Sequence, residues 1–219
     1  SNADLVDSDC LVHCANTASM FLGKHFHGNM VRIGLGWLGA CPPGRAVEGL
    51  CDDVKLHPAV SWSSSIVQVR HVPAGHPVGY DGCWRPARDS MLGVIPVGYA
   101  DGYPQPPHPS ARPGGGPVVG VMQQGSVLGH APVAGVVSMD QVIIDLTDIA
   151  LSEQVIPGCR VELLSRDPDA PNSLLALSAS AGLKPHALLA RLHTRIARVH
   201  HGDQPEIAVP LSGKRIAAG

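Results

Sequence analysis

Several features that mark other classes of protein are missing from this 219-residue sequence. No run of apolar residues approaches the roughly 18 residues that a membrane-spanning helix needs. Positive charge is not in excess, because 16 Lys and Arg residues face 18 Asp and Glu residues and the formal net charge is -2. A nucleic-acid-binding surface normally requires a basic patch. We therefore expect no membrane segment and no nucleic-acid partner.

Motifs of zinc and phosphate chemistry are absent as well. No two of the 12 His residues stand four positions apart with an acidic residue between them, which argues against a zinc-protease helix. The Gly114-Gly115-Gly116 run is not followed by Lys-Ser or Lys-Thr, so it is no phosphate-binding loop. The 6 Cys residues include no Cys-x-x-Cys pair. We interpret them as reduced thiols of a cytoplasmic protein.

The first zone of the chain, residues 4–50, has the pattern strand, helix, strand. Apolar runs at 10–12 and 30–35 flank a helical stretch at 19–23. Strands that alternate with helices indicate an α/β arrangement with parallel pairing. The zone holds at most two such units, whereas a closed barrel needs about eight. We therefore expect an incomplete part of a parallel sheet, with further strands upstream.

The second zone, residues 58–165, is a series of short strands. We predict them at 62–72, 91–97, 117–122, 133–137, 141–146 and 160–164. Strands of this length and spacing predict an antiparallel barrel or sandwich. The Pro- and Gly-rich stretch 104–117 is predicted to be an exposed, mobile loop.

The third zone is helical. Asn172 or Ser173 is placed to cap a helix that stops at Gly182. Pro185 suits the first position of a second helix. The tail from Gly202 onward is predicted to be irregular and frayed.

Four separated motifs occur in order along the chain. They are His13-Cys14-Ala15-Asn16-Thr17-Ala18, Met30-Val31-Arg32-Ile33-Gly34-Leu35, Pro73-Ala74-Gly75 with Val78-Gly79-Tyr80 and Ile95-Pro96-Val97-Gly98-Tyr99-Ala100-Asp101-Gly102, and Val137-Ser138-Met139-Asp140-Gln141. Together they resemble the motifs of the bacterial alanine racemases, which are fold-type III enzymes that depend on pyridoxal phosphate. The resemblance runs from about Leu11 to Arg198.

The resemblance implies a fold and an assembly. The family has an N-terminal (β/α)8 barrel that holds pyridoxal phosphate, followed by a β-rich domain. Its active sites form between the barrel of one subunit and the β domain of the partner. By this resemblance, residues 4–50 are the last strands of the barrel, and residues 51–219 are a mainly β, barrel-like C-terminal domain. A homodimer that acts on a small amino acid is implied.

Racemisation needs two bases on opposite faces of the substrate Cα. In the family these are the lysine that forms a Schiff base with the cofactor and a tyrosine of the β domain, whose position Tyr80 occupies. A phenol has an unperturbed pKa of about 10, so it needs help to act as a base near neutral pH. The family uses a neighbouring histidine, which His13 matches. Without the motif, Tyr80 would be an ordinary half-buried strand tyrosine.

Other residues match cofactor-binding positions of the family. Arg32 matches the arginine that faces the pyridine nitrogen, and because arginine does not yield a proton, that nitrogen stays unprotonated, which favours proton transfer over side reactions. Thr17 stands where the family has serine. Gly34 and Leu35 can offer backbone N–H groups to the phosphate. His186 replaces the tyrosine that holds the phosphate in the family.

The resemblance also assigns substrate-binding residues. Tyr99 and Met139 match residues that reach into the partner's site and restrict substrate size, although core packing is the ordinary role of a methionine. Three positions depart from the family pattern. Gln105 and Val136 stand where arginines are usual, and Asp81 stands where the family has glycine. Because lost positive charge weakens the capture of a carboxylate, another amino-acid substrate stays open.

The largest departure concerns lysine. The family's cofactor-binding lysine lies in an apolar strand near the start of the barrel, and the lysines at 24, 55, 184 and 214 have no such context. We therefore predict a fragment of an alanine racemase, an isomerase of L- and D-alanine that works by two-base proton transfer. Alone it should be inactive and should not bind the cofactor covalently. The alternatives are a non-catalytic dimerisation or binding module and a racemase paralogue with another substrate.

Overall fold

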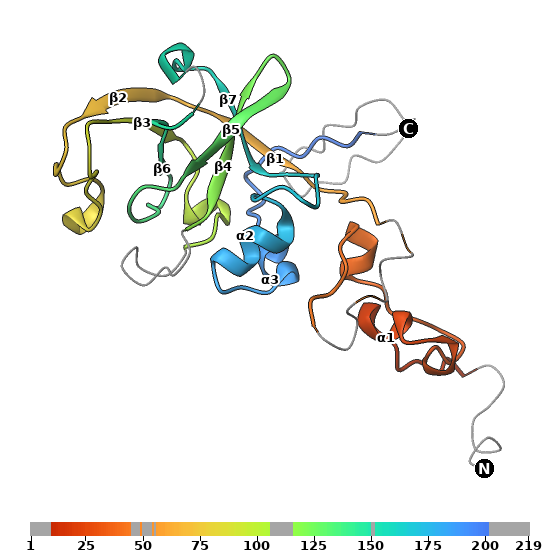
Figure 1. Cartoon of the computed structure of the whole chain (residues 1–219). Coiled ribbons are helices and arrows are strands. Elements are labelled where there is room, and N and C mark those ends of the chain that lie inside the picture. The colour runs from red at the N-terminus through yellow and green to blue at the C-terminus, as the bar shows by residue number, and fades with distance from the viewer. Residues whose placement is uncertain are drawn as a thin grey trace, which may run out of the picture.

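A computed structural model of the protein describes residues 10–44, 49, 54, 56–105, 116–149 and 152–201. Figure 1 shows a β-rich body, residues 56–200, and to one side of it an N-terminal segment, residues 10–44, that carries α1. Most of the stretch 104–117, the Cys51-containing linker and the tail from Gly202 lie outside the described residues.

The β-rich body consists of two antiparallel sheets. One has the order β1 (Trp62–Ser65), β7 (Arg160–Leu164), β4 (Val118–Gln123) and β5 (Ser126–Pro132). The other has the order β2 (Gln68–Val72), β3 (Ser90–Ile95) and β6 (Val142–Asp145). The prediction of a mainly β fold with antiparallel strands is confirmed. The two sheets do not close into one continuous barrel within the described residues.

The two sheets are joined where the chain passes from β1 to β2. The Ile66 N–H donates to Cys159 O, beside β7, whereas the next N–H, that of Val67, donates to Val94 O in β3. The single strand predicted at 62–72 is therefore divided, because its hydrogen bonds change partner sheet at this point. A second link is an isolated antiparallel bridge between Val133 and Ile144.

The hairpin of β4 and β5 corrects another predicted strand. Residues 133–137 do not form a strand, and the partner of β4 is instead β5, which ends at Pro132. Gln124 and Gly125 connect the two strands, and both have positive φ, 49° and 84°. Two such residues in a row make the turn that suits the right-handed twist of a hairpin. The prediction of strand 133–137 failed because Gln-Gly was not recognised as a turn.

The core lies between the sheets and extends under the C-terminal helices. Every residue of β3 is buried, and buried residues alternate with half-buried ones along β6. Fully buried aliphatic side chains of β4, β6 and β7 form one continuous cluster; they include Val119, Val121, Val142, Ile144, Val161 and Leu163. This cluster allows the β-rich body to be stable on its own contacts.

The predicted C-terminal helices are confirmed. Helix α2 (Leu174–Ser180) begins after Ser173, whose hydroxyl accepts from the Ala176 N–H at 3.4 Å. Helix α3 (Pro185–Ala190) has Pro185 in its first turn, where a missing N–H costs nothing. Leu188 of α3 is fully buried in the core. The helices thus cover one side of the sheets (Figure 1).

The N-terminal segment has little regular structure. It contains α1 (Thr17–Phe21) and the 3₁₀ helices η2 (Lys24–Phe26) and η3 (Leu35–Leu38), and the strands predicted at 10–12 and 30–35 are not formed. Two extended stretches nevertheless pair in parallel, because Asn29 N–H donates to Val12 O and Arg32 N–H donates to Ala15 O. Two such bonds are too few for a ladder, which explains the missing strands.

Cysteine chemistry also corrects an expectation. Cys41 takes part in a disulfide bond, so the prediction that all cysteines are reduced is wrong for this residue. Cys10, Cys14, Cys83 and Cys159 are free thiols. Cysteine pairing depends on which residues the fold brings together, and sequence spacing alone does not reveal it.

Among the described residues, no helix is long and apolar enough to cross a membrane.

Candidate active site

The first group of predicted site residues meets in the N-terminal segment. Thr17 is buried at the start of α1, and its hydroxyl accepts from the Gly34 N–H at 3.0 Å and from the Gly36 N–H at 3.4 Å. The N–H of Leu35, between them, has no partner among the described residues. A side chain built on Gly34 would meet nothing within 4 Å. The turn is therefore open to a ligand at a backbone donor.

Arg32 and His13 flank this turn. The Arg32 backbone N–H donates to Ala15 O at 2.9 Å, which ties it to the stretch that contains His13. Both side chains are exposed, and the described part of the chain gives neither of them a hydrogen bond or an ion pair. Arg32 is thus not the salt-bridged surface arginine that its residue type alone would suggest. Its guanidinium is available to a ligand.

A second group lies in the β-rich body, where two loops hold Tyr99 and Met139 together. Tyr99 is in the 3₁₀ helix η6 (Tyr99–Asp101), and its N–H donates to Ser138 O at 3.0 Å. The Ala100 N–H donates to Met139 O at 2.9 Å. A side chain on Gly98 would meet Met139 O at 2.3 Å, so only glycine allows the two loops to approach this closely. Both Tyr99 (42%) and Met139 (59%) are exposed. Met139 is therefore not a core residue.

Tyr80 lies on a third loop, which passes beside the segment that leads to Met139. It begins the 3₁₀ helix η5 (Tyr80–Gly82), and its side chain is 68% exposed. A Cβ added at the preceding residue, Gly79, would lie 3.9 Å from Val136 N, so the segment that leads to Met139 passes beside this loop. The three exposed side chains Tyr80, Tyr99 and Met139 thus come from three adjoining loops.

The described structure does not bring all the predicted residues together. The loop of Tyr80 lies at the opposite end of the molecule from α1 (Figure 1), so Tyr80 does not reach His13 or Thr17 within one chain. His186 is exposed at the start of α3, and no hydrogen bond or ion pair links it to Thr17 in the described residues. The residues form two separate half-sites, with His186 apart from both.

One pair of polar residues at the second half-site escaped the sequence analysis. Asp101 is buried, and its carboxylate accepts from Arg195 Nε at 2.6 Å and from the Gly98 N–H at 2.9 Å. Burial alone would raise the pKa of Asp101, but these hydrogen bonds and the charge of Arg195 outweigh it and lower the pKa below 3.8. Asp101 therefore carries a negative charge at neutral pH. The two residues are far apart in sequence, and no local pattern indicates the pair.

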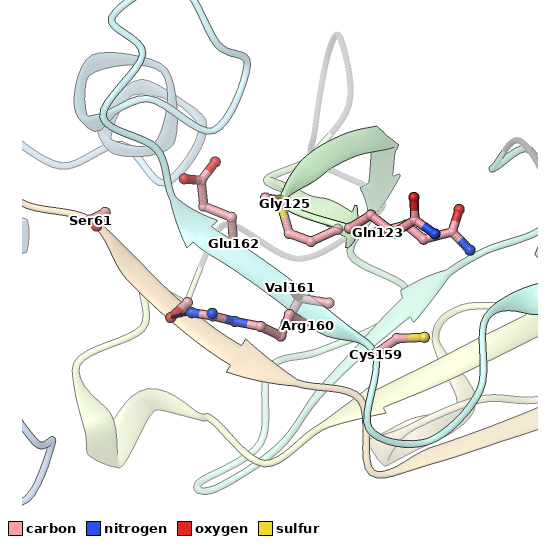
Figure 2. A pocket seen from close by; sticks show the side chains of 10 residues that line it. Ser61, Gln123, Gly125, Cys159, Arg160, Val161 and Glu162 are labelled. Atoms are coloured by element: carbon pink, nitrogen blue, oxygen red, sulfur yellow. Dashed lines mark hydrogen bonds between the residues drawn. The ribbon is translucent and has the colours of Figure 1, made fainter.

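A pocket elsewhere in the molecule is not part of this site. Figure 2 shows it on the face of the sheet formed by β1, β7 and β4, with side chains such as Gln123, Arg160 and Glu162 around it. The Arg160 guanidinium donates to the Ser63 hydroxyl at 3.2 Å. None of the predicted site residues lines this pocket. Tyr80, Tyr99 and Met139 are therefore exposed residues that lie outside this pocket.

Comparison with known proteins identifies the family. Residues 59–200 match the family model described as the alanine racemase C-terminal domain. The chain belongs to this family. The alanine racemase of Xanthomonas axonopodis pv. citri is 38% identical over 172 residues, which are 78% of this chain and 41% of that protein. The chain thus spans less than half the length of this alanine racemase.

Solved alanine racemase structures have the same fold. The enzyme from Bacillus anthracis with bound L-Ala-P superposes with a TM-score of 0.74 at 23% identity, over 94% of this chain and 48% of that chain. The enzyme from Bartonella henselae with covalently bound pyridoxal phosphate superposes with a TM-score of 0.67 at 31% identity, over 84% of this chain and 45% of that chain. The mainly β alanine racemase fold is therefore confirmed.

Proposed function

We propose that this chain is the C-terminal portion of an alanine racemase, an amino-acid isomerase that interconverts L- and D-alanine with pyridoxal phosphate. Residues 4–50 are then the last strands of the cofactor-binding barrel, and residues 51–219 are the C-terminal domain. The observation that carries the proposal is that both half-sites are formed and exposed but lie apart in one chain. A homodimer brings the Tyr80 loop of one subunit to the Thr17 turn of the other.

The Thr17 turn suits the phosphate of the cofactor. Thr17 fixes the backbone N–H groups of Gly34 and Gly36, while the Leu35 N–H is free to donate to an anion. The open space at Gly34 gives the phosphate room to approach. By the resemblance, Arg32 would face the pyridine nitrogen, and His186 would donate a hydrogen bond to the phosphate. When bound, the cofactor withdraws electrons from the substrate Cα.

Proton transfer is the task of the Tyr80 hydroxyl. Tyr80 takes the proton from one face of the substrate Cα or returns it. The family's cofactor-binding lysine, which lies near the start of the barrel, acts on the other face. In the assembled site a ring N–H of His13 would donate a hydrogen bond to the Tyr80 oxygen and so favour the basic form of Tyr80. Tyr99 and Met139 close the substrate pocket and limit the size of the side chain it admits.

Reconstitution with a barrel segment tests this proposal. The chain is mixed with a separately produced, lysine-bearing barrel segment of an alanine racemase, and D-alanine formation from L-alanine is followed with pyridoxal phosphate present. We expect activity from the mixture and none from this chain alone. Tyr80→Phe, which keeps the ring and removes the hydroxyl, should lower the rate at least about 100-fold.

The control is a variant at an exposed tyrosine of the same half-site. Tyr99→Phe removes a hydroxyl as well, but it should change the rate far less because Tyr99 transfers no proton. A folded, associated mixture without activity would contradict the proposal, and so would Tyr80→Phe that is as active as the unsubstituted chain.

Two other functions stay open. A racemase for another amino acid is favoured by Gln105, which stands where the family usually has arginine. Its side-chain amide donates to Val137 O at 3.4 Å, close in sequence to Met139. A non-catalytic dimerisation module is favoured by the continuous core cluster, most of whose residues belong to the β-rich body. Racemisation of a larger amino acid by the mixture would support the first, and a stable dimer that binds no cofactor would support the second.

The four free thiols favour a location in the cytoplasm, whereas the disulfide of Cys41 does not.

A further inference from the structure

The C-terminal stretch 191–198 packs directly against the loop of Tyr99. The His193 N–H donates to Asp101 O at 2.9 Å, and Arg195 Nε donates to Asp101 Oδ1 at 2.6 Å. A side chain on Gly102 would meet Arg191 O at 2.3 Å, so the two backbones are in close contact. The loop that carries Tyr99 is thus held from a part of the chain that is distant in sequence.

Asp101 is the centre of this contact. One carboxylate oxygen accepts from Arg195, and the other accepts from the Gly98 N–H at 2.9 Å. The carboxylate therefore spans the turn from Gly98 to Asp101 and ties its first residue to the C-terminal stretch. Charge-assisted bonds of this kind are stronger than neutral ones, and Asp101 is largely shielded from water.

Arg195 also interacts with the neighbouring loop. Its pKa is raised first by the hydrogen bond to Asp101 and then by the negative charges of Asp101 and Asp140. Asp140 follows Met139 directly, and Asp101 follows Tyr99 by two residues. The charge of Asp140 thus adds to the attraction that Asp101 exerts on the guanidinium, whose hydrogen-bond partner is Asp101.

The two side chains themselves are not fixed by the core. Tyr99 and Met139 are exposed, so their positions depend on the backbone of the two loops. The N–H groups of Tyr99 and Ala100 bond the two loops to each other, and the ion pair of Arg195 with Asp101 ties the loop of Tyr99 to the C-terminal stretch.

We propose that Arg195 is a positioning residue of the racemase site: by holding Asp101 it fixes the loop of Tyr99, and the N–H groups of Tyr99 and Ala100 in turn hold the loop of Met139. This inference rests on the proposed function, because it takes Tyr99 and Met139 as the residues that limit substrate size. Arg195 itself touches no substrate. Its removal loosens both loops and widens the range of side chains that the site admits.

Amide hydrogen exchange of the full chain tests the structural part. In Arg195→Gln, the amides of Tyr99 and Ala100 should exchange about tenfold faster, since a charge-assisted hydrogen bond that closes the loop is lost. Amides of β3 should be unaffected. Arg195→Lys keeps the charge, so the exchange rates of these two amides should lie between those of the unsubstituted chain and of Arg195→Gln.

Arg191→Gln replaces an exposed arginine of the same stretch. It is the matched control and should leave the exchange rates unchanged. Unchanged exchange at Tyr99 and Ala100 in Arg195→Gln overturns the proposal.

Substrate discrimination of the reconstituted mixture tests the functional part. Arg195→Gln should raise the KM for alanine more than it lowers kcat, and should increase the rate with serine relative to alanine. A purely structural loss would lower both rates equally, and that result also overturns the proposal. If the mixture of the unsubstituted chain with the barrel segment gives no racemase activity at all, the proposed function fails, while the exchange measurement still decides whether Arg195 holds the loop of Tyr99.

Discussion

The β-rich body and the N-terminal segment bury their apolar side chains to very different degrees. In the body, Ile144 and its neighbours are completely buried in a continuous cluster. In the N-terminal segment, Trp37 is 80% exposed and Leu11 is 64% exposed, and among its described residues only Leu35 and Ala40 join the core cluster. The body therefore supplies its own core, whereas the segment presents apolar side chains that it does not cover.

The backbones differ in the same way. Each strand of the body belongs to an antiparallel ladder, but the stretches around Val12 and Arg32 share only two parallel hydrogen bonds. Parallel strands are normally covered on both faces. The β-rich body is therefore held by its own antiparallel ladders, whereas the described N-terminal segment has few backbone pairings. Substitutions in each region test this contrast.

The largest effect is expected from paired truncations of one buried and one exposed side chain. Ile144→Ala should lower the free energy of unfolding by about 2–5 kcal/mol, because it leaves a cavity in the core. Trp37→Ala should change it by less than about 0.5 kcal/mol, because its side chain is exposed. Urea unfolding of both variants measures the difference. A comparable loss for Trp37→Ala would show that the N-terminal segment has a core of its own.

The junction between the two regions should be the next most sensitive point. Gly39 has a φ of 77°, and a side chain there would meet His57 O at 1.8 Å. Gly39→Ala should therefore cost about 1–3 kcal/mol and break the hydrogen bond from the Ala59 N–H to Leu38 O. We expect faster proteolysis between residues 38 and 59, with the β-rich body left intact.

Gly34→Ala is the control for this junction. A side chain there meets nothing within 4 Å, and its φ of -110° is negative, so proteolysis should not accelerate. Loss of the β-rich body as well in Gly39→Ala would mean that the two regions unfold as one unit.

Acid should weaken the contact of Asp101 within the body. The hydrogen bond from Arg195 and the charges of Arg195 and His193 lower the pKa of Asp101 below 3.8. The charged Asp101 carboxylate therefore stabilises the fold above pH 3.8, and this contribution is lost as the pH falls through the pKa of Asp101 in the folded chain. Asp101→Asn should cost about 1–2 kcal/mol near neutral pH, given that Arg195 is half exposed. The difference from the unsubstituted chain should shrink below pH 3.8 in urea unfolding at several pH values. A difference that grows with acid would contradict this assignment.

Local signals account for what the sequence predicted correctly. Ser173 and Pro185 mark the starts of α2 and α3 through capping and the fixed φ of proline. Apolar alternation located β3, β4, β6 and β7 to within a few residues. The signals failed where a neighbour decides the outcome. The strand predicted at 62–72 divides because Ile66 and Val67 bond to different sheets, which only the folded arrangement reveals.

The candidate site follows the same rule. The motifs pointed to Thr17, Gly34, Tyr99 and Met139. They did not reveal that the Thr17 hydroxyl accepts hydrogen bonds from two backbone N–H groups. The bond between Asp101 and Arg195 spans 94 positions, and no periodicity or spacing links two such residues. Long-range polar contacts of this kind are set by the tertiary fold, so the sequence named the motif residues but not the ion pair that holds the loop of Tyr99.

The smallest effect is expected at a strained residue beside Tyr80. Asp81 has a φ of 60°, a left-handed conformation that costs a non-glycine residue roughly 1–2 kcal/mol. Asp81→Gly removes this strain but adds freedom to the unfolded chain, so we expect a net gain of about 0.5 kcal/mol, or a rise in Tm of about 1–2 °C. Gln124→Gly, with a φ of 49° in the β4–β5 turn, should give a similar rise. If Asp81→Gly instead lowers Tm while Gln124→Gly raises it, the Asp81 carboxylate stabilises the loop of Tyr80 by more than its backbone strain costs.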